Sequence, residues 1–167
     1  MKNIGIFYGT TTGKTEAIVD EIEFNLRKLD YEVFNVKYGI KKIKDFENII
    51  MVTPSYGVGE LQEDWIKNLD ELKEIDFTGK KIALVGLGNQ FAFGESFVSA
   101  MRILYDIVTN NKGTVVGFTS TKGYSFDESE AVVDNQFVGL AIDENNQDDE
   151  TPNRIKEWVE EIKKYFI

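Results

Sequence analysis

Short apolar runs alternate along this chain with stretches in which apolar residues recur every three or four positions. A short apolar run indicates a buried strand, and the longer spacing indicates an amphipathic helix. The predicted strands are 4–8, 33–36, 49–52, 82–85 and 115–118, and the predicted helices are 14–29, 63–72, 95–109 and a last one from about 152. Strands that alternate with helices favour a parallel sheet with helices on both faces.

The helical patterns also predict which side chains face the core. The inward residues are expected to be Ala17, Ile18, Ile22, Leu26 and Leu29 in the first helix, and Trp65, Ile66, Leu69 and Leu72 in the second. In the last helix, Thr151 is placed to cap the first turn and Pro152 to occupy the first helical position.

One segment, 120–138, interrupts the alternation, because it is long and polar and carries Tyr124, Phe126 and Phe137. Loops of this length are uncommon and are usually functional or disordered. The apolar run 139–142 then resumes the edge strand, so the segment is an insertion that we expect to lie apart from any ligand site. With no internal repeat and no linker, residues 1–167 are predicted to form a single domain.

In an open parallel sheet, ligands bind beyond the carboxyl ends of the strands. The loop after the first predicted strand, 9–15, holds four threonines between and beside two glycines. Free N–H groups and hydroxyls at the start of a helix can surround a phosphate. A nucleotide P-loop is disfavoured, because Gly9 and Gly13 enclose one residue too few and strand 49–52 lacks a terminal aspartate.

Two further loops carry aromatic residues among glycines. They are 53–61, with Tyr56 between Ser55 and Gly57, and 86–94, with Phe91 and Phe93. Exposed rings in such loops favour a role as walls of a binding site. Together the loops predict a site for a flat, phosphorylated ring system.

Composition removes most other chemistry. The chain has no cysteine and no histidine, which excludes disulfides, thiolate metal sites and Ser–His–Asp catalysis, and no metal site is predicted. Redox activity would therefore require a bound organic cofactor. The net charge of −10 disfavours nucleic acid and anionic membranes and fits a basic protein partner, although acidity also serves solubility. No apolar run reaches the ~18 residues of a membrane span, and the start does not resemble a signal peptide, so the cytoplasm is expected.

Four motifs resemble the flavodoxin family, in its long-chain form. They are Ile-Gly-Ile-Phe-Tyr-Gly-Thr-x-Thr-Gly-Lys-Thr at 4–15, Gly-Glu-Leu-Gln-x-Asp-Trp at 59–65, Gly-x-Gly-x-Gln at 86–90 and Phe-Val-Gly-Leu-Ala-Ile-Asp-Glu-x-Asn-Gln at 137–147. The resemblance spans essentially the whole chain. It implies a flavodoxin-like three-layer α/β sandwich, with a five-stranded parallel sheet of order 2-1-3-4-5 and an insertion in strand five. It also implies non-covalently bound FMN.

The resemblance implies a role for each site residue. Thr10, Thr11, Thr12, Gly13 and Thr15 would hold the FMN phosphate, and Lys14 lies in the same loop. Ser55 and Asp143 would contact the ribityl chain, Tyr56 and Phe93 would flank the flavin, and Asn89, next to Gly88, would bond the pyrimidine edge. The Gly57 peptide would turn over on reduction, so that its carbonyl faces flavin N5.

At three positions the chain departs from common family choices, which are Trp for Tyr56, Tyr for Phe93 and Asp for Asn89. Phe93 either stacks on the flavin or packs in the core. Loss of the carboxylate at Asn89 should slightly ease the accumulation of negative charge on the flavin.

The predicted function is a low-potential one-electron carrier, a monomer that takes electrons from a reductase and passes them to low-potential enzymes. Glu60, Glu63 and Asp64 are expected to orient a basic partner. Two alternatives stay open at this point, an FMN-dependent NAD(P)H:quinone reductase of the same fold and a cofactor-free regulatory domain.

Overall fold

The computed structural model describes residues 1–167 and is built on one parallel sheet. Its first four strands are β2 (Tyr31–Asn35), at one edge, followed by β1 (Ile4–Tyr8), β3 (Asn48–Tyr56) and β5 (Lys81–Leu87), in the order β2-β1-β3-β5. The edge beyond β5 is shared by β6 (Thr114–Val116) and β10 (Leu140–Ile142), both parallel to β5. The predicted fold class and strand order 2-1-3-4-5 are confirmed.

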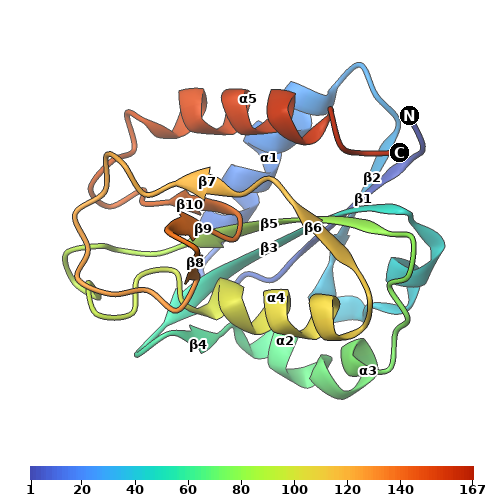
Figure 1. Ribbon diagram of the computed structural model, residues 1–167, viewed down its shortest axis with the longest axis horizontal. Coiled ribbons are helices and arrows are strands. Elements are labelled where there is room, and N and C mark those ends of the chain that lie inside the picture. Colours follow the sequence, from blue (N-terminus) through green and yellow to red (C-terminus); the bar gives the residue numbers. More distant parts are fainter.

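Helices cover both faces of the sheet (Figure 1). On one face lie α1 (Lys14–Leu26) and α5 (Thr151–Ile162), and on the other lie α2 (Glu63–Lys67), α3 (Leu69–Lys73) and α4 (Ala100–Asn110). Strand β3 shows why the central strands read as unbroken apolar runs. Ile49 and Met51 pack into the core beneath α4, whereas Ile50 and Val52 pack into the core beneath α1 and α5.

The fifth strand is split in register. β6 pairs with the first part of β5, ending with Val116 opposite Ala83, and β10 begins with Leu140 opposite Val85. Leu84 is therefore the only residue of β5 between the part that pairs with β6 and the part that pairs with β10. The intervening residues form a small antiparallel sheet of β7 (Thr119–Ser120), β9 (Gln136–Phe137) and β8 (Val132–Val133).

We expected this insertion only to extend the edge of the sheet, apart from any ligand site. It does more than that. It packs on the segment that follows β5, where buried Phe97 contacts the rings of Tyr124, Phe126 and Phe137 at centroid distances of 5.8, 5.5 and 5.9 Å. The Gly94 carbonyl accepts hydrogen bonds from the amides of the insertion residues Asp127 and Glu128. The Tyr124 hydroxyl donates to the Ala141 carbonyl at 2.7 Å, and burial raises the pKa of Tyr124 to about 12. The insertion therefore supports a loop of the predicted site.

Several helix predictions need correction. Residues 63–72 form two short helices rather than one, with Asn68 between them donating to the carbonyls of Val36 and Asp64. Ile66 and Ala17, both predicted to face inward, are exposed. Helix α4 begins at Ala100 instead of Glu95, because residues 90–99 form turns against the insertion.

The start of α5 also differs from the prediction. Thr151 is the first residue of the helix, not its cap, and its hydroxyl binds the Glu144 carboxylate. The remaining elements are the 3-10 turns η1 (Val36–Tyr38) and η2 (Lys41–Asp45) and the strand β4 (Glu60–Leu61). None of the helices is long and apolar enough to span a membrane.

Candidate functional site

The loops that follow β1, β3, β5 and β10 meet at one cavity of about 270 Å³. The cavity is lined by Thr12, Lys14, Thr15, Pro54, Tyr56, Leu87, Gly88, Asn89, Phe93, Glu144 and Asn145. All four strands are parallel, so their carboxyl ends lie at the same edge of the sheet, as the rule for open α/β sheets requires.

The loop after β1 leaves the start of α1 open to a ligand. Gly13 precedes the helix at φ +85°, and no side chain caps the first turn. The Thr10 hydroxyl accepts the Gly13 amide at 3.0 Å, which closes the loop on itself. Thr12 and Lys14 are exposed at the cavity and Thr15 is buried at its base. The free N–H groups and hydroxyls therefore form an anion-binding cradle.

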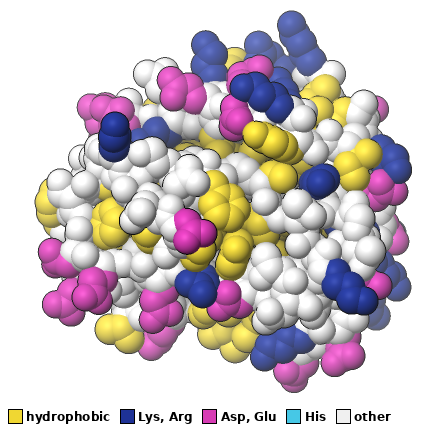
Figure 2. Space-filling view, viewed as in Figure 1, with side chains coloured by type: hydrophobic (Ala, Val, Ile, Leu, Met, Phe, Trp, Pro, Cys, Tyr) yellow, Lys and Arg dark blue, Asp and Glu magenta, His cyan; other side chains and the backbone are white.

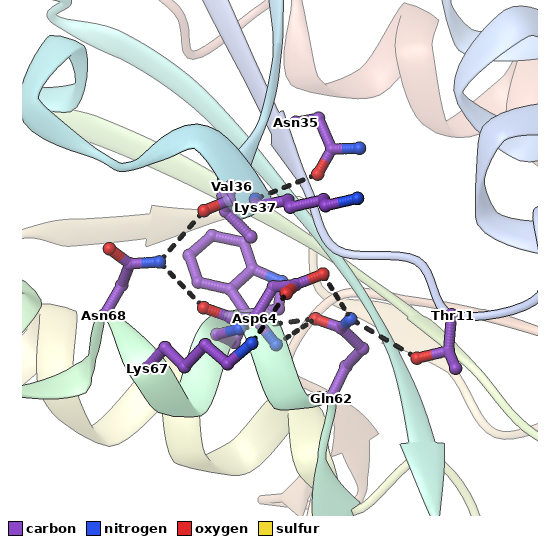
Figure 3. Close-up of polar contacts among 9 residues, drawn as sticks. Thr11, Asn35, Val36, Lys37, Gln62, Asp64, Lys67 and Asn68 are labelled. Carbon is purple, nitrogen blue, oxygen red and sulfur yellow. Dashed lines mark hydrogen bonds and ion pairs between the residues drawn. The ribbon is translucent and has the colours of Figure 1, made fainter.

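Gln62 supports this loop from behind (Figure 3), and the Trp65 ring lies against Gly9. The buried Gln62 amide donates to the Thr11 hydroxyl at 3.4 Å and to Asp64 at 2.8 Å. A Cβ at Gly9 would overlap the Gln62 amide oxygen and come within 2.8 Å of the Trp65 ring. The loop thus lies directly against the start of α2.

The two aromatic rings come from different loops. Tyr56 ends β3, and Phe93 follows β5, where its side chain is 49% exposed and lines the cavity. The alternative that Phe93 packs in the core is therefore wrong. The Asn89 side-chain oxygen fixes the turn before Phe93, accepting the amides of Phe91 at 3.1 Å and Ala92 at 2.9 Å.

Asp143 connects two of the loops. Its carboxylate is fully buried and accepts the backbone amide of Gln90 at 3.1 Å and the Gln90 side-chain amide at 2.8 Å. It also accepts the backbone amides of Asn145 and Asn146, both at 3.1 Å. These donors compensate the burial of the charge and hold the loop after β10 against the loop after β5.

A larger hollow of about 650 Å³ lies between residues 95–99 and the insertion. Glu95, Asp127, Glu128 and Glu130 are among the residues that line it. Acidic side chains are also frequent on the left side of Figure 2, whereas lysines and arginines are more frequent on its right and top. The hollow contains neither the anion-binding loop nor Tyr56, so the smaller cavity is the better candidate site.

Comparisons with known proteins show the family of the chain. The family model described as flavodoxin matches residues 6–158. The chain belongs to the flavodoxin family. Flavodoxins of Synechocystis and Helicobacter pylori are 45% and 43% identical to it, over 98% and 99% of this chain and 97% and 99% of their own. A crystal structure of Fusobacterium nucleatum flavodoxin bound to flavin mononucleotide is 59% identical, with a TM-score of 0.99 and complete coverage of both chains.

Membership of the flavodoxin family confirms the resemblance that the four motifs indicated. Flavodoxins are electron-transfer flavoproteins that use FMN, so the predicted cofactor and the electron-carrier function are confirmed. The quinone reductase alternative is not favoured.

The structure brings together only part of the predicted site. Thr12, Lys14, Thr15, Tyr56, Gly88, Asn89 and Phe93 line the cavity. Thr10, Thr11, Gly13 and Gly57 adjoin it in the same loops. Ser55 points elsewhere, with its hydroxyl accepting the Ala100 amide at 3.0 Å, and the Asp143 carboxylate is fully engaged in the bonds described above.

Sequence reasoning missed two kinds of residue. Pro54, Leu87, Glu144 and Asn145 line the cavity, and each lies within two positions of a predicted site residue. Gln62 and Gln90 hold loops in place, and both belong to the motifs quoted above, which gave them no role. The motifs marked the positions, but they carried no information about where the amides point.

Proposed function

We propose that FMN binds in the 270 Å³ cavity, with its phosphate on residues 10–15 and its ring between Tyr56 and Phe93. The observation that carries the proposal is the position of the uncapped start of α1, which opens into the same cavity as both rings. The arrangement suits a ligand with a dianionic group at one end and a flat apolar group at the other.

The residues present fit this cofactor. The threonine hydroxyls and amides supply donors for a phosphate, and Lys14 adds a positive charge at the cavity. The chain lacks cysteine and histidine, and FMN supplies the one-electron redox chemistry that its side chains cannot.

The chain's own groups set the conditions for that chemistry. Tyr56 and Phe93 exclude water from the faces of the ring, and the Asn89 NH₂ group is left to bond its edge, because the Asn89 oxygen is engaged in the loop. Dry walls, Glu144 at the cavity and the net charge of −10 all disfavour added negative charge. A low reduction potential for the second electron follows.

Substitution of Thr12 by valine tests the assignment of the phosphate. The Thr12→Val variant loses a hydroxyl that would bond a charged oxygen, which costs ~1.5–3 kcal/mol, or roughly ten- to a hundredfold in FMN affinity. Riboflavin lacks the phosphate, so its affinity should not change. Titration of the apoprotein with each flavin, followed by fluorescence quenching, measures both.

Thr114→Val is a matched control, because Thr114 is an exposed threonine at the opposite end of the sheet. It should leave both affinities unchanged. Equal losses of FMN and riboflavin affinity in Thr12→Val would show that the loop is structural and would refute the assignment.

We also propose that the chain is a monomer and that basic redox proteins dock on it next to Tyr56, on an acidic surface that includes Glu60 and Glu63. A reductase would be the electron donor, and low-potential enzymes would be the acceptors. Glu60, which pairs with Tyr56, and Glu63, which begins α2, are exposed and suit this role. Asp64 does not, because it is 5% exposed and bonded to Gln62, so the expectation that it orients a partner is corrected.

Ionic strength tests this docking. Electron transfer to cytochrome c, a basic acceptor, should slow as salt rises to about 0.5 M, where screening is strong. Neutralising Glu60 and Glu63 to glutamine should weaken that dependence, whereas Glu74→Gln, at an exposed position beyond α3, should not. A rate that ignores both salt and the two substitutions would leave the acidity as a device for solubility.

A further inference from the structure

Gln62 is an uncharged side chain with no access to solvent, and all of its amide atoms are engaged. Its oxygen accepts the backbone amides of Asp64 at 3.0 Å and Trp65 at 3.3 Å, at the first turn of α2. Its nitrogen donates one hydrogen to the Asp64 carboxylate and the other to the Thr11 hydroxyl.

These partners fix the orientation of the amide. Rotation by half a turn would place the NH₂ group against two N–H donors and the oxygen against the Asp64 carboxylate, so both sets of bonds would be lost. Asp64 is itself nearly buried, and its ion pair with Lys67 is long, at 3.9 Å. The second hydrogen of the Gln62 nitrogen is therefore directed at Thr11, as Figure 3 shows.

The contact between Gln62 and the loop is close at two points. Besides the bond to Thr11, the Gln62 oxygen lies where a Cβ of residue 9 would be, so that only glycine allows the loop to approach. Thr11 uses a lone pair to accept the amide hydrogen, which leaves its own hydroxyl proton for another acceptor.

We propose that Gln62 is a positioning residue for the phosphate-binding loop. By holding Thr11 from behind, it fixes the backbone of residues 10–13 around the anion and directs the Thr11 hydroxyl proton away from α2. This inference rests on the proposed function, because it assumes that the loop binds the FMN phosphate.

A role limited to capping α2 would leave phosphate recognition untouched, and a paired substitution separates the two roles. In Gln62→Glu combined with Asp64→Asn, a carboxylate oxygen still accepts the two α2 amides, and the side-chain amide introduced at position 64 can donate to the other oxygen. The donor to Thr11 is the only one of these interactions that is lost. Asp64→Asn alone is the matched control, because Gln62 then keeps both of its donors.

FMN and riboflavin affinities of the apoprotein give the readout. In the paired variant we expect FMN affinity to fall about three- to tenfold, the range for loss of one neutral hydrogen bond, while riboflavin affinity stays the same. Thr11→Val should lose at least as much FMN affinity, because it removes the Thr11 hydroxyl together with its contact to Gln62. The effects of Thr11→Val and the paired variant should add less than fully, because both remove that contact. Stabilisation of the apoprotein by inorganic phosphate, measured as a shift in melting temperature, should shrink in parallel.

Asn68→Ala controls for general weakening of α2, since Asn68 bonds the carbonyls of Val36 and Asp64 on the side away from the loop. It should lower the melting temperature without changing the ratio of the two flavin affinities. The inference is overturned if the paired variant keeps the parent's ratio, or if its effect adds fully to that of Thr11→Val. If the parent itself binds riboflavin as tightly as FMN, the proposed phosphate site fails together with the inference. Should the paired variant not fold, Thr11→Val alone decides, and an unchanged ratio there refutes the proposal.

Discussion

At the scale of single residues, two polar side chains at the site hold its loops in place through backbone amides. The buried Asp143 carboxylate accepts donors from residues 90, 145 and 146, and the Asn89 oxygen accepts donors from residues 91 and 92. These bonds are complete within the chain. The cavity walls are therefore organised before a ligand enters, which lowers the ordering cost of binding.

We expect Gly57 to influence the redox potential directly. It has a φ of +53°, and a Cβ there would come within 3.3 Å of the Glu60 carboxyl carbon. A residue with a Cβ resists this left-handed conformation by ~1–2 kcal/mol. If the Gly57 carbonyl turns to face flavin N5 when the first electron is taken up, Gly57→Val should lower the first midpoint potential by very roughly 40–90 mV. The conversion is ~59 mV per tenfold change in the one-electron equilibrium.

A redox titration that resolves both midpoint potentials measures this effect. Gly79→Val is a matched control, because Gly79 has a φ of +77° and nothing within 4 Å of its would-be Cβ. That variant should lose stability without any change in potential. An unchanged gap between the two potentials in Gly57→Val would refute the role of the Gly57 carbonyl.

Residue types and positions could be predicted from the sequence, but the directions of the side chains could not. Thr12, Thr15, Tyr56 and Phe93 line one cavity, because their loops follow strands that are neighbours in the parallel sheet. Ser55 and Asp143 occupy the expected loops, yet their hydrogen-bond partners are at residues 100 and 90, far away in sequence. A single sequence contains no signal for such pairings.

At the scale of elements, the starts of α2 and α4 are bonded to other segments next to the site. Helix α4 has no capping bond from Ser99, the residue that precedes it, and the Ser55 hydroxyl from β3 accepts the Ala100 amide instead. Gln62, the residue before α2, caps that helix and also reaches the loop before α1. Hydrogen bonds therefore join these helix starts to the segments that form the site.

Ser55→Ala should therefore weaken the protein rather than its cofactor site. Loss of a capping hydroxyl costs ~1 kcal/mol of unfolding free energy, and urea denaturation of the apoprotein measures it. FMN affinity should change by less than about twofold, which corresponds to ~0.4 kcal/mol of binding free energy. The opposite pattern, unchanged stability with weaker FMN binding, would restore the ribityl contact that the resemblance implies.

At the scale of the whole molecule, the insertion and the site form one structure. Phe97, Gly94 and Gln90 all lie in the segment after β5 and all bind the insertion. The sheet was predictable because buried strands and amphipathic helices carry strong periodic signals. The docking of the insertion was not, because its short strands are two residues long and its contacts are non-local.

The register of the split strand defines a clean excision. Replacing residues 117–139 with one valine would place that valine opposite Leu84 and leave β6 and β10 in their present pairing with β5. We expect a folded protein that loses about 2–4 kcal/mol of stability, because Phe97 loses its aromatic neighbours. FMN and riboflavin should both bind more weakly but detectably, since the phosphate loop is untouched.

Thermal denaturation and flavin titration check this expectation. A replacement of two residues is the control, because a shift of one position would turn the side chains of β10 to the wrong faces. It should fold poorly. A one-residue variant that folds but has lost FMN entirely would show that the insertion is part of the site.

The single-residue gap between β6 and β10 also bears on descent. A segment that enters a strand at one position, and returns the chain to the next pairing, changes no hydrogen bond elsewhere in the sheet. Lineages could gain or lose such a segment in one genetic event, without passing through a mispaired ancestor. Selection could then reshape its outer surface freely, while the residues that touch Phe97 and Gly94 would change only together with the loop they support.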